Sequence, residues 1–399
     1  MLHVGIDATS WTNNRGFGRF TRELVKALVR QNRDSRYTLL FDQQPPGDLP
    51  KGVDVITAST GSTLTESAVG KTSRSFAYLW DMGRVARKTR FDVFFFPSVY
   101  SYFPILARVP CVVCYHDTTA ERFPKLVFPT RLNQRLWQAK TTLARLQTTR
   151  AMTISQSSSQ DLQQMFHFQP ERIDVVTEGA DPVFRIIDDR TIIAKARVRQ
   201  GIPEHADLLV YVGGINPHKN LLGLLDAMPR VLSEHPSAHL AIVGDTSGKG
   251  FWDNVADVKA VVANDSVLAR QVHFTGYMPD TELAQLLNGA AALVFPSLWE
   301  GFGLPAIEAM SCGLPVLASR CSSLPEVIGD AGLFFDPKNS SDISSCLLQF
   351  LRDPSLRTRL RELALARVPL FTWERAAELA DNSFRQCYAD AGERRGPRP

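Results

Sequence analysis

The chain has 399 residues, which is enough for two domains of ordinary size that each bury a core. Its composition, with 44% hydrophobic and 22% charged residues, is that of a globular protein. No apolar run reaches the roughly 18 residues that a membrane-spanning helix needs, and Asp7 interrupts the apolar N-terminal segment. The composition therefore argues against a membrane-spanning protein and predicts a soluble protein of the cytoplasm.

Charge is divided unevenly between the two halves of the chain. Residues 1–185 contain 24 Lys and Arg against 16 Asp and Glu, whereas the remaining residues contain 21 against 25. A basic half is typical of a protein that meets an acidic partner. We expect this half to face a phosphorylated acceptor or an anionic membrane surface, and no nucleic acid.

Short apolar runs alternate with helical patterns from one end of the chain to the other. Nearly continuous apolar strands separated by helices are typical of a parallel sheet covered on both faces. In the first half, strands are predicted at His3–Ala8, Tyr37–Phe41, Val93–Phe96, Cys111–Tyr115 and Met152–Ile154. In the second half, they are predicted at Leu208–Val212, Leu240–Val243, Val272–Phe274, Leu293–Phe295, Val316–Ala318 and Leu333–Phe335.

The strand pattern restarts near residue 205, after a linker and a helix predicted over 189–200. We therefore predict an α/β protein with two doubly wound domains, over 1–185 and 190–372. Two such domains in tandem leave a cleft between the carboxyl ends of their strands, where ligands bind. A long helix capped by Thr372 follows, and the polar tail 392–399 is predicted to be disordered.

Further helices are predicted over 71–90 and 122–150. The second of these contains basic residues and no acidic one, and four of its leucines recur at helical spacing: Leu132, Leu136, Leu143 and Leu146. Two interpretations stay open. The leucines form either the core-facing side of a solvated helix or part of a surface that attaches peripherally to the inner face of an anionic membrane.

The most informative segment is 295–308, which reads Phe-Pro-Ser-Leu-Trp-Glu-Gly-Phe-Gly-Leu-Pro-Ala-Ile-Glu. A strand ends at Phe295, a glycine-rich loop follows, and Pro305 stands where the first turn of a helix is expected. The N–H groups at such a helix start suit a diphosphate. Glu308 then lies one turn into the helix among apolar residues, where a carboxylate is costly unless it is paired or meets ligand hydroxyls. A solvated helix face is the alternative.

This segment closely resembles the signature of glycosyltransferase family 4, with Glu300 and Glu308 separated by seven residues. The similarity covers most of residues 208–336 and includes 213–220, Gly-Gly-Ile-Asn-Pro-His-Lys-Asn. It implies a retaining enzyme with the GT-B fold, in which two Rossmann-like domains face each other across a cleft. It also implies that the final helix, 373–391, crosses back to the N-terminal, acceptor-binding domain.

The family pattern implies a donor site for a nucleotide diphosphate sugar in the second domain. Lys219 would neutralise the leaving diphosphate and Glu308 would bind the ribose. The donor sugar would be held by Glu300, Gly301, Phe302, Gly303 and Leu304, and the base would be lined by Gly276 and Tyr277. One departure stands out: many relatives carry an arginine at the position of Gly214. His218 and Arg320 are the candidates for replacing that cation.

The first domain contributes two candidate elements. His116 follows a predicted strand and precedes Asp117, which resembles a His-Asp segment whose histidine contacts the donor sugar near the reacting carbon; a structural role is the alternative. Residues 16–19, Gly-Phe-Gly-Arg, precede a helix predicted over Thr21–Arg30. We interpret them as the mobile loop that relatives place over donor and acceptor, with Gly18 and Arg19 near the phosphates. The predicted catalytic residues are therefore His116, Glu300 and Lys219.

No Asp-x-Asp pair occurs in the sequence. Because that pattern would hold a metal on the diphosphate, we predict charge stabilisation without a metal or other cofactor, through Lys219 and the helix start. The resemblance implies front-face attack, in which the departing phosphate takes the proton of the acceptor. The predicted reaction transfers a hexose, with a preference for mannose or a related sugar, to a glycan or lipid-linked acceptor in cell-surface polysaccharide or glycolipid synthesis.

Three other functions were weighed. A retaining or inverting GT-B enzyme outside family 4 is disfavoured by the spacing of Glu300 and Glu308. A nicotinamide-dependent oxidoreductase would need an intact Gly-x-Gly-x-x-Gly after the first strand, and Thr21 takes the place of its third glycine. A non-catalytic GT-B scaffold that binds a nucleotide sugar stays open, because Gly214 could mark lost activity.

Overall fold

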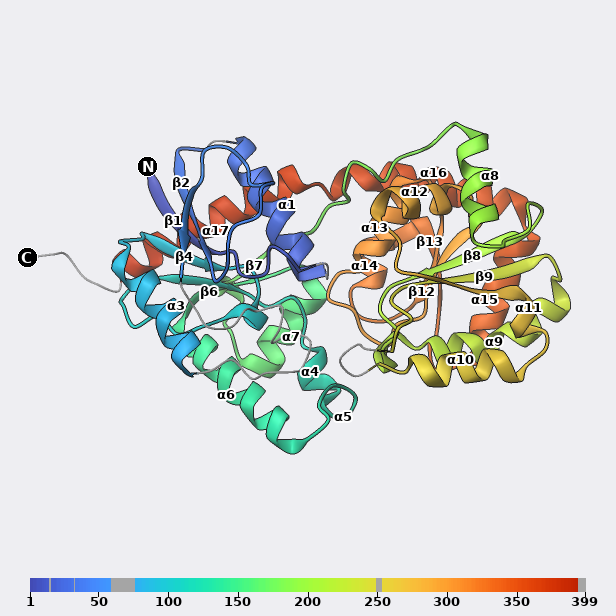
Figure 1. Cartoon of the computed structure of the whole chain (residues 1–399), viewed down its shortest axis with the longest axis horizontal. Helices are drawn as coiled ribbons and strands as arrows, with labels where there is room; N and C mark the ends of the chain where they lie inside the picture. Colours follow the sequence, from blue (N-terminus) through green and yellow to red (C-terminus); the bar gives the residue numbers. More distant parts are fainter. Residues whose placement is uncertain (14–15, 32, 59–75, 249–252, 394–399) are drawn as a thin grey trace, which may run out of the picture. The chain divides into compact units, whose positions relative to one another are not determined.

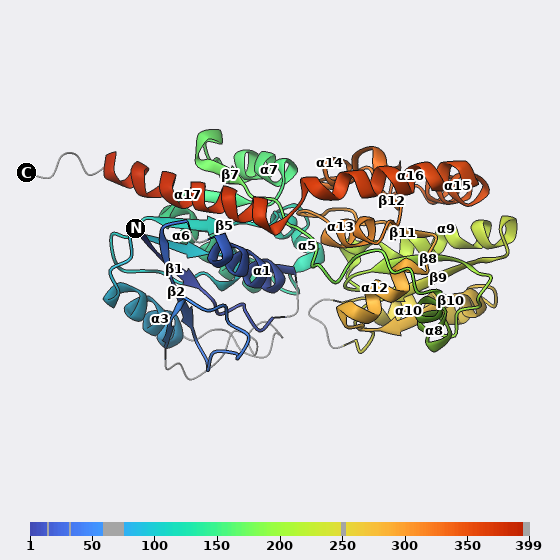
Figure 2. The ribbon, with the colours of Figure 1, turned by 90° about the horizontal axis from the view of Figure 1, so that it is seen from above.

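The computed structural model describes all residues except 14–15, 32, 59–75, 249–252 and 394–399. The chain divides into two compact units, of which the first comprises Met1–Glu178 with the segment from Thr372, and the second comprises Gly179–Phe371. In each unit a sheet of parallel strands carries helices on both faces (Figures 1 and 2). None of the helices in the described ranges has the length and apolar character needed to cross a bilayer.

The first unit has a seven-stranded sheet in the order β3-β2-β1-β4-β5-β6-β7. Its strands are β1 (Leu2–Asp7), β2 (Ser35–Phe41), β3 (Asp54–Thr57), β4 (Val93–Phe96), β5 (Cys111–Cys114), β6 (Thr148–Thr153) and β7 (Ile173–Val175). Its helices are α1 (Gly16–Gln31), α3 (Phe76–Lys88), α4 (Thr119–Arg122), α5 (Pro124–Val127), α6 (Arg131–Gln147), α7 (Gln156–Phe166) and α17 (Trp373–Glu393), with short 3-10 turns η1 (Val99–Ser101) and η2 (Pro170–Arg172).

All five strands predicted in this half are confirmed, but the prediction missed β3 and β7. These two strands form the edges of the sheet. Most of β3 is exposed, and β7 is only partly buried. Because an edge strand packs on fewer neighbours, its sequence lacks the apolar run by which the inner strands were identified.

The two faces of this sheet are covered by different helices. Phe94 and Phe96 pack with Met82 of α3 and Ala144 of α6 in one hydrophobic cluster. The intervening Phe95 contacts Phe384 of α17 on the other face, with ring centroids 5.1 Å apart. This alternation is the period of two expected of a strand buried on both sides.

The single helix predicted over 122–150 is wrong. The structure has α4, α5 and α6 there, and β6 begins at Thr148. Pro124 starts α5 and Pro129 precedes the N-cap Thr130 of α6, and a proline disfavours helix both at its own interior position and at the residue before it. Arg150, counted with the helix, is a buried residue of β6.

Arg150 ties α17 to the sheet of the first unit. Its guanidinium lies 2.8 Å from Asp174 of β7 and 2.9 Å from Asp390 of α17. The hydrogen bonds to these carboxylates raise the pKa of Arg150. The Thr372 hydroxyl accepts a hydrogen bond from the Arg375 amide at 3.2 Å, which confirms the predicted cap.

The prediction for the C-terminal tail needs one correction. Residues 392 and 393, taken as its first two residues, still belong to α17. The rest of that tail, 394–399, lies outside the described residues.

The second unit has a six-stranded sheet in the order β10-β9-β8-β11-β12-β13. Its strands, all predicted, are β8 (Asp207–Val212), β9 (Ala238–Val243), β10 (Val272–Gly276), β11 (Ala292–Phe295), β12 (Val316–Ser319) and β13 (Gly332–Phe335). Its helices are α8 (Arg190–Arg199), α9 (Leu221–Glu234), α10 (Val255–Asn264), α11 (Leu268–Gln271), α12 (Asp280–Asn288), α13 (Leu304–Ser311), α14 (Leu324–Ile328), α15 (Ser340–Arg352) and α16 (Pro354–Arg367), with 3-10 turns η3 (Pro217–Lys219), η4 (Gly329–Ala331) and η5 (Val368–Leu370).

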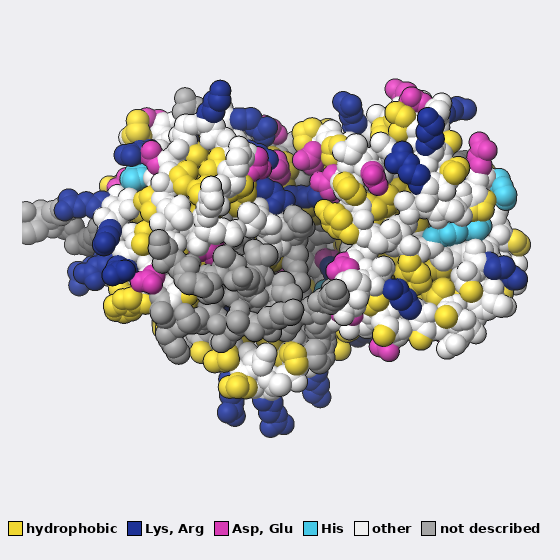
Figure 3. Space-filling view, viewed as in Figure 1, with side chains coloured by type: hydrophobic (Ala, Val, Ile, Leu, Met, Phe, Trp, Pro, Cys, Tyr) yellow, Lys and Arg dark blue, Asp and Glu magenta, His cyan; other side chains and the backbone are white. Residues whose placement is uncertain are grey.

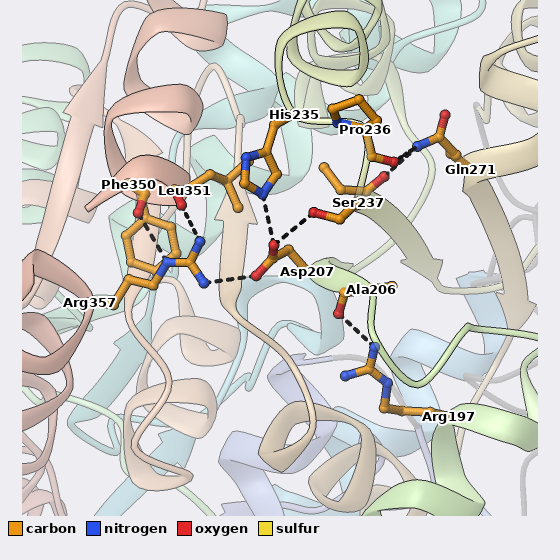
Figure 4. A network of polar contacts seen from close by, with 11 residues as sticks. Arg197, Ala206, Asp207, His235, Pro236, Ser237, Gln271, Phe350, Leu351 and Arg357 are labelled. Atoms are coloured by element: carbon orange, nitrogen blue, oxygen red, sulfur yellow. Dashed lines mark hydrogen bonds and ion pairs between the residues drawn. The ribbon is translucent and has the colours of Figure 1, made fainter. Parts of the chain in front are cut away.

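A polar network closes the amino-terminal end of this second sheet (Figure 4). Asp207, the first residue of β8, accepts hydrogen bonds from His235 at 2.7 Å and Arg357 at 2.8 Å. Burial alone would raise the pKa of Asp207, but these hydrogen bonds outweigh burial and lower it. The network fastens α16 to the end of the sheet at which the strands begin. It therefore does not occupy the carboxyl ends of the strands, where ligands bind in folds of this kind.

Candidate active site

The order of strands in the second unit predicts a ligand site at the carboxyl ends of the strands, which together form the carboxyl edge of the sheet. The chain runs outward from β8 through β9 to β10 and then returns to β11 on the other side of β8. At such a reversal, the loops after the two central strands diverge and open a crevice at their carboxyl ends. The loop after β8 contains Lys219, and the loop after β11 contains Glu300.

The two loops are joined directly. The Lys219 ammonium lies 2.6 Å from a carboxylate oxygen of Glu300, and the two side chains are 20% and 11% exposed. The Leu298 amide also donates to the carbonyl of His218 at 2.8 Å. A positive and a negative group, both largely withdrawn from water but still accessible, therefore meet where the strand order reverses.

Asn220 fixes the position of Lys219. It adopts a left-handed backbone conformation with φ of 58°, which asparagine tolerates better than most residues. Its side-chain amide donates to the carbonyls of Pro296 at 3.2 Å and Pro337 at 2.7 Å. The turn that carries the lysine is thus held to the loops after β11 and β13.

The backbone around Glu300 is held by two serines. The Ser322 hydroxyl accepts from the Glu300 amide at 2.8 Å. The Ser323 hydroxyl donates to the carbonyls of Glu300 at 3.1 Å and Phe302 at 2.8 Å. Sequence reasoning missed both serines; their signal was the run of small residues, Cys-Ser-Ser, just before α14.

The turn into α13 requires a glycine. Gly303 has φ of 102°, and a Cβ there would come within 2.9 Å of Leu324. The helix begins at Leu304 with Pro305 in its first turn, as predicted, and Gly301, Phe302 and Leu304 are all buried. The positive end of this eight-residue helix therefore lies at the same edge as Lys219. Of its first residues, Pro305 has no N–H and the Ala306 N–H donates to the Gly303 carbonyl at 2.8 Å, so the Leu304 N–H is the candidate donor to a ligand.

Glu308 is confirmed as a helical residue, but it is not on a solvated face. It lies in the middle of α13 and is 4% exposed. A buried carboxylate is costly unless it is hydrogen-bonded. The structure therefore excludes a solvated helix face for Glu308, and its role in binding the ribose stays a prediction.

Gly214, at the position where many relatives carry an arginine, accepts a hydrogen bond through its backbone carbonyl. The Tyr211 hydroxyl donates to the Gly214 carbonyl at 2.6 Å. Burial, and then the nearby Glu300 carboxylate, raise the pKa of Tyr211 well above its usual value. Tyr211 is a third residue that sequence reasoning missed, because a tyrosine inside an apolar strand gives no signal beyond burial.

Arg320 does not supply the missing cation. Its guanidinium donates to the carbonyl of Phe334 at 3.1 Å, on β13, and thus on the side of β12 away from β11. It lines a pocket of about 400 Å³ with residues of β13 and α15. His218 remains beside Lys219 in η3.

The loop after β10 differs from the buried parts of the site. Gly276 has φ of 74° with no atom near its Cβ position, and Tyr277 is 65% exposed. The Gly276 carbonyl accepts from the Gly244 amide at 3.1 Å, which ties this loop to the end of β9. An exposed ring on a fixed turn is suited to stacking on a planar ligand.

In the first unit, the segment predicted as a loop at 16–19 is helical. It forms the first turn of α1, which starts at Gly16 rather than Thr21. Gly18 is buried, and a Cβ there would lie 2.0 Å from the Asn13 carbonyl oxygen. Gly18 is therefore a packing glycine that lets the loop after β1 cross the helix start, and the half-buried Arg19 follows it on the helix.

His116 lies at the carboxyl end of β5, as predicted, and is buried. Its Nε2 is 2.8 Å from the carbonyl oxygen of Pro97; because a carbonyl only accepts, Nε2 carries the proton. Burial lowers the pKa of His116, although the Pro97 carbonyl and Asp117 oppose this effect. A neutral imidazole results, whose Nδ1 is the hydrogen-bond acceptor.

The structure brings the second-unit residues together and keeps the first-unit residues in a separate group. Lys219, Glu300 and Gly303 lie in the loops that follow β8 and β11, and Glu308 follows them in α13. His116 instead contacts Phe20 of α1, with ring centroids 4.9 Å apart, which associates it with Gly18 and Arg19. Each unit thus has one group of candidate residues at the carboxyl edge of its sheet.

Comparisons with known proteins agree with this architecture. The chain is 38% identical over 176 residues to an O-antigen chain mannosyltransferase B of Escherichia coli, which covers 44% of this chain and 45% of that protein. The chain spans about half the length of the first curated relatives that it matches.

Solved structures extend the similarity to the whole fold. A sucrose-phosphate synthase from Thermosynechococcus elongatus superposes with a TM-score of 0.76 at 19% identity, over 98% of this chain and 100% of that one. Anabaena Alr3699/HepE, solved in complex with UDP and glucose, gives a TM-score of 0.74 at 18% identity, over 97% and 100%. At this identity the superpositions establish the GT-B fold alone.

Two family models match consecutive parts of the chain. The model for glycosyl transferases group 1 matches residues 193–367, and the model for glycosyltransferase family 4 matches residues 14–184. Together they span most of the chain, which therefore belongs to the group 1 glycosyltransferases of the family 4 type.

Proposed function

We propose that the chain transfers a hexose from a nucleoside diphosphate sugar to a glycan or lipid-linked acceptor, with retention of configuration. The observation that carries this proposal is the ion pair between Lys219 and Glu300 at the reversal of strand order, next to the start of α13. A diphosphate needs cationic and N–H groups, and a sugar needs hydroxyl acceptors. This edge offers both within a few ångströms.

In this proposal each group has a separate task. Lys219 and the Leu304 N–H at the start of α13 stabilise the charge that grows on the departing diphosphate. Glu300 accepts hydroxyls of the donor sugar, Glu308 accepts the ribose hydroxyls, and Tyr277 covers the base. The leaving phosphate takes the acceptor's proton. The protein contributes position and electrostatics, so no metal is needed.

His116 serves the same reaction from the first unit. With Nε2–H donated to Pro97, its Nδ1 can accept a hydroxyl of the donor sugar. Arg19, in the first turn of α1, is the second cation proposed for the phosphates, and it compensates for the absence of an arginine at position 214. Domain closure excludes water and limits hydrolysis of the donor.

The comparisons support the class of substrate. One relative is named a mannosyltransferase of O-antigen chains, and a protein of the same fold was solved with UDP and glucose. We propose mannose or a related hexose as the donor sugar, and cell-surface polysaccharide or glycolipid synthesis as the process.

Thermal unfolding with a panel of nucleoside diphosphates and their sugars, in EDTA, tests the donor site. A ligand at about 100 times its dissociation constant stabilises the native state by about 2.7 kcal/mol. We expect a selective rise in melting temperature for one nucleotide, abolished in Glu308→Ala and kept in Glu362→Ala, an exposed glutamate of α16. A rise that requires Mg²⁺ contradicts the metal-free mechanism.

A non-catalytic scaffold that binds a nucleotide sugar is the second candidate, favoured by Gly214. Slow release of nucleoside diphosphate without acceptor distinguishes the two, because only an enzyme hydrolyses its donor. Gly214→Arg adds a further test. The backbone at 214 is not in the left-handed region, and a Cβ would meet only the Asn216 side chain. A scaffold that lost activity at this position is expected to gain hydrolysis in this variant.

A further inference from the structure

The leucines of α6 are exposed. Leu132, Leu136, Leu143 and Leu146 are 64%, 58%, 51% and 80% exposed. The interpretation of this stripe as the core-facing side of a helix is therefore wrong. Scattered surface leucines need no explanation, but four on one helix form a patch of the kind that marks an interaction site.

The helix buries its other side. Thr141 and Ala144 are buried, and Trp137 contacts Tyr100 with ring centroids 5.0 Å apart. The leucines follow each other at intervals of four, seven and three residues, which keeps them on one face, opposite these packed residues. The helix thus has one side for the fold and another that no described residue covers.

Basic side chains border the leucines. Arg131 and Arg135 precede or lie between the first two leucines and are exposed, as is Lys125 of α5. In the described part of the chain, no carboxylate forms an ion pair with these three residues, and the acid-free run extends over all of α5 and α6. Hydrophobic and basic side chains lie together along the lower edge of the molecule in Figure 3, where Figure 1 has α6.

Two arginines outside α5 and α6 are neutralised. Arg122 forms an ion pair with Asp161, and Arg150 forms one with Asp174. The basic residues of α6 are different: Lys140 and Arg145 donate to backbone carbonyls, and Arg131 and Arg135 lie exposed beside the leucines. A partner with a polar surface would not bury four exposed leucines. A partner with a purely apolar surface would not pair with the basic side chains beside them.

We propose that the exposed face of α5 and α6 attaches the first unit to an anionic lipid membrane, with the leucines in the boundary between head groups and acyl chains and the basic residues on the head groups. A helix with this division of side chains lies in the plane of the interface. Basic residues within a Debye length of anionic lipids add attraction that salt weakens.

The helix that carries this surface is connected to the candidate site of the same unit through its packed side. Phe17 in the first turn of α1 stacks on Tyr100 at 5.7 Å, and Tyr100 in turn contacts Trp137 of α6. Lys140 also donates to the Tyr100 carbonyl at 2.7 Å. The helix start that carries Gly18 and Arg19 thus connects to the packed side of α6, whereas the proposed membrane-facing leucines lie on the opposite side of that helix. The attachment itself does not depend on the proposed transfer.

Flotation with lipid vesicles tests the attachment. The wild-type chain is expected to float with vesicles of phosphatidylcholine containing about one third phosphatidylglycerol at low salt, and to be released by 0.5 M NaCl. The double variant Leu136→Gln/Leu143→Gln is expected to lose at least about tenfold in partition coefficient. Arg131→Gln/Arg135→Gln is expected to bind more weakly at low salt and to respond less to added salt.

Matched changes on the second unit are the control. Leu222 and Leu363 are 38% and 36% exposed, and Leu222→Gln/Leu363→Gln is expected to bind vesicles as the wild type does. Donor hydrolysis without vesicles is expected to be unchanged in every variant, so a failed attachment and a failed donor site give different results.

Two outcomes overturn the proposal. One is a wild-type chain that stays unbound on anionic vesicles at low salt, or a leucine variant that binds as well as the wild type. The other is a wild-type chain that forms dimers in solution while the leucine variant is monomeric without any change in vesicle binding. The second result assigns the leucine face to contact between copies of the chain.

Discussion

The carboxyl edges of the two sheets carry different kinds of side chain, charged in the second unit and neutral in the first. In the second unit, the edge holds an ion pair, Lys219 with Glu300, and a buried carboxylate, Glu308. In the first unit, the edge holds a neutral histidine, His116, against Phe20. Charged groups suit a diphosphate, whereas a neutral acceptor beside aromatic rings suits a sugar. The difference teaches that one fold, used twice in a chain, can present two chemically different surfaces at the same edge of its sheet.

The largest expected effect tests the charged edge. Lys219→Ala is expected to lower turnover by about 10²–10³-fold, because it removes the cation that we propose to stabilise the leaving diphosphate. Lys195→Ala, which changes an exposed lysine of α8, serves as the control. Turnover should be measured together with the melting temperature, since Glu300 loses its partner. A Lys219→Ala enzyme with near wild-type turnover would move the charge stabilisation to other groups.

The neutral edge comes next. His116→Ala is expected to lower turnover by about 10²-fold through loss of sugar positioning, with a smaller effect on stability. His167→Ala changes an exposed histidine of the same unit and should leave turnover unaffected. If stability falls while turnover per folded molecule is kept, His116 has only the structural role left open by the sequence.

The glycines of the two edges allow a direct comparison. Gly303→Ala places a side chain at φ of 102°, and Gly18→Ala places one 2.0 Å from the Asn13 carbonyl. Each is expected to cost about 1–3 kcal/mol in unfolding free energy. Because Gly303 shapes the candidate donor site of the second unit, its variant is expected to reduce the thermal shift by nucleotide more than the Gly18 variant does.

Control variants separate backbone strain from close contact. A Cβ at Gly201 or Gly16 meets nothing within 4 Å, and only Gly201 has positive φ, 67°. Gly201→Ala therefore measures the cost of backbone strain alone. Gly16→Ala measures the effect of the substitution where there is neither backbone strain nor a close contact. A Gly18→Ala protein as stable as Gly16→Ala would mean that the loop after β1 moves freely.

The sequence predicted the local structure around the glycine-rich turn well because its determinants lie close together along the chain. The turn at Gly303, the helix start at Pro305 and the position of Glu308 all fall within six residues. The contact of Lys219 with Glu300 spans 81 residues, and only the family resemblance brought the two loops together. The serines at 322 and 323 were missed because they act through hydrogen bonds to backbone atoms far away in the sequence.

The first unit was predicted less well, for two physical reasons. The start of α1 contains glycines, which propensity excludes from helices, yet Gly18 is required there by the approach of Asn13. For α6, periodicity identified the leucine stripe but could not tell on which side the fold would lie. The packed side turned out to be the one with Trp137, Thr141 and Ala144.

The smallest expected effect is a dependence of stability on pH, and it again differs between the units. Burial lowers the pKa of His116 in the first unit, and of His239 and His273 in the second. The unfolded chain then binds more protons than the folded one. The stabilisation is complete above the unfolded value of 6.5 and is lost progressively as pH falls below it.

Unfolding in urea at a series of pH values from about 7.5 to 5 measures this effect. The wild-type free energy of unfolding is expected to fall with decreasing pH, and His116→Asn is expected to flatten that slope by a fraction of a proton. His273→Asn should flatten the slope less than His116→Asn does, because His273 is only half-buried and its charged form loses less hydration. A steeper slope in His116→Asn would mean that folding raises the pKa of His116, and its Nδ1 would then be protonated over more of this pH range and not free to accept a sugar hydroxyl. No slope in the wild type would mean that folding does not lower the pKa values of these histidines.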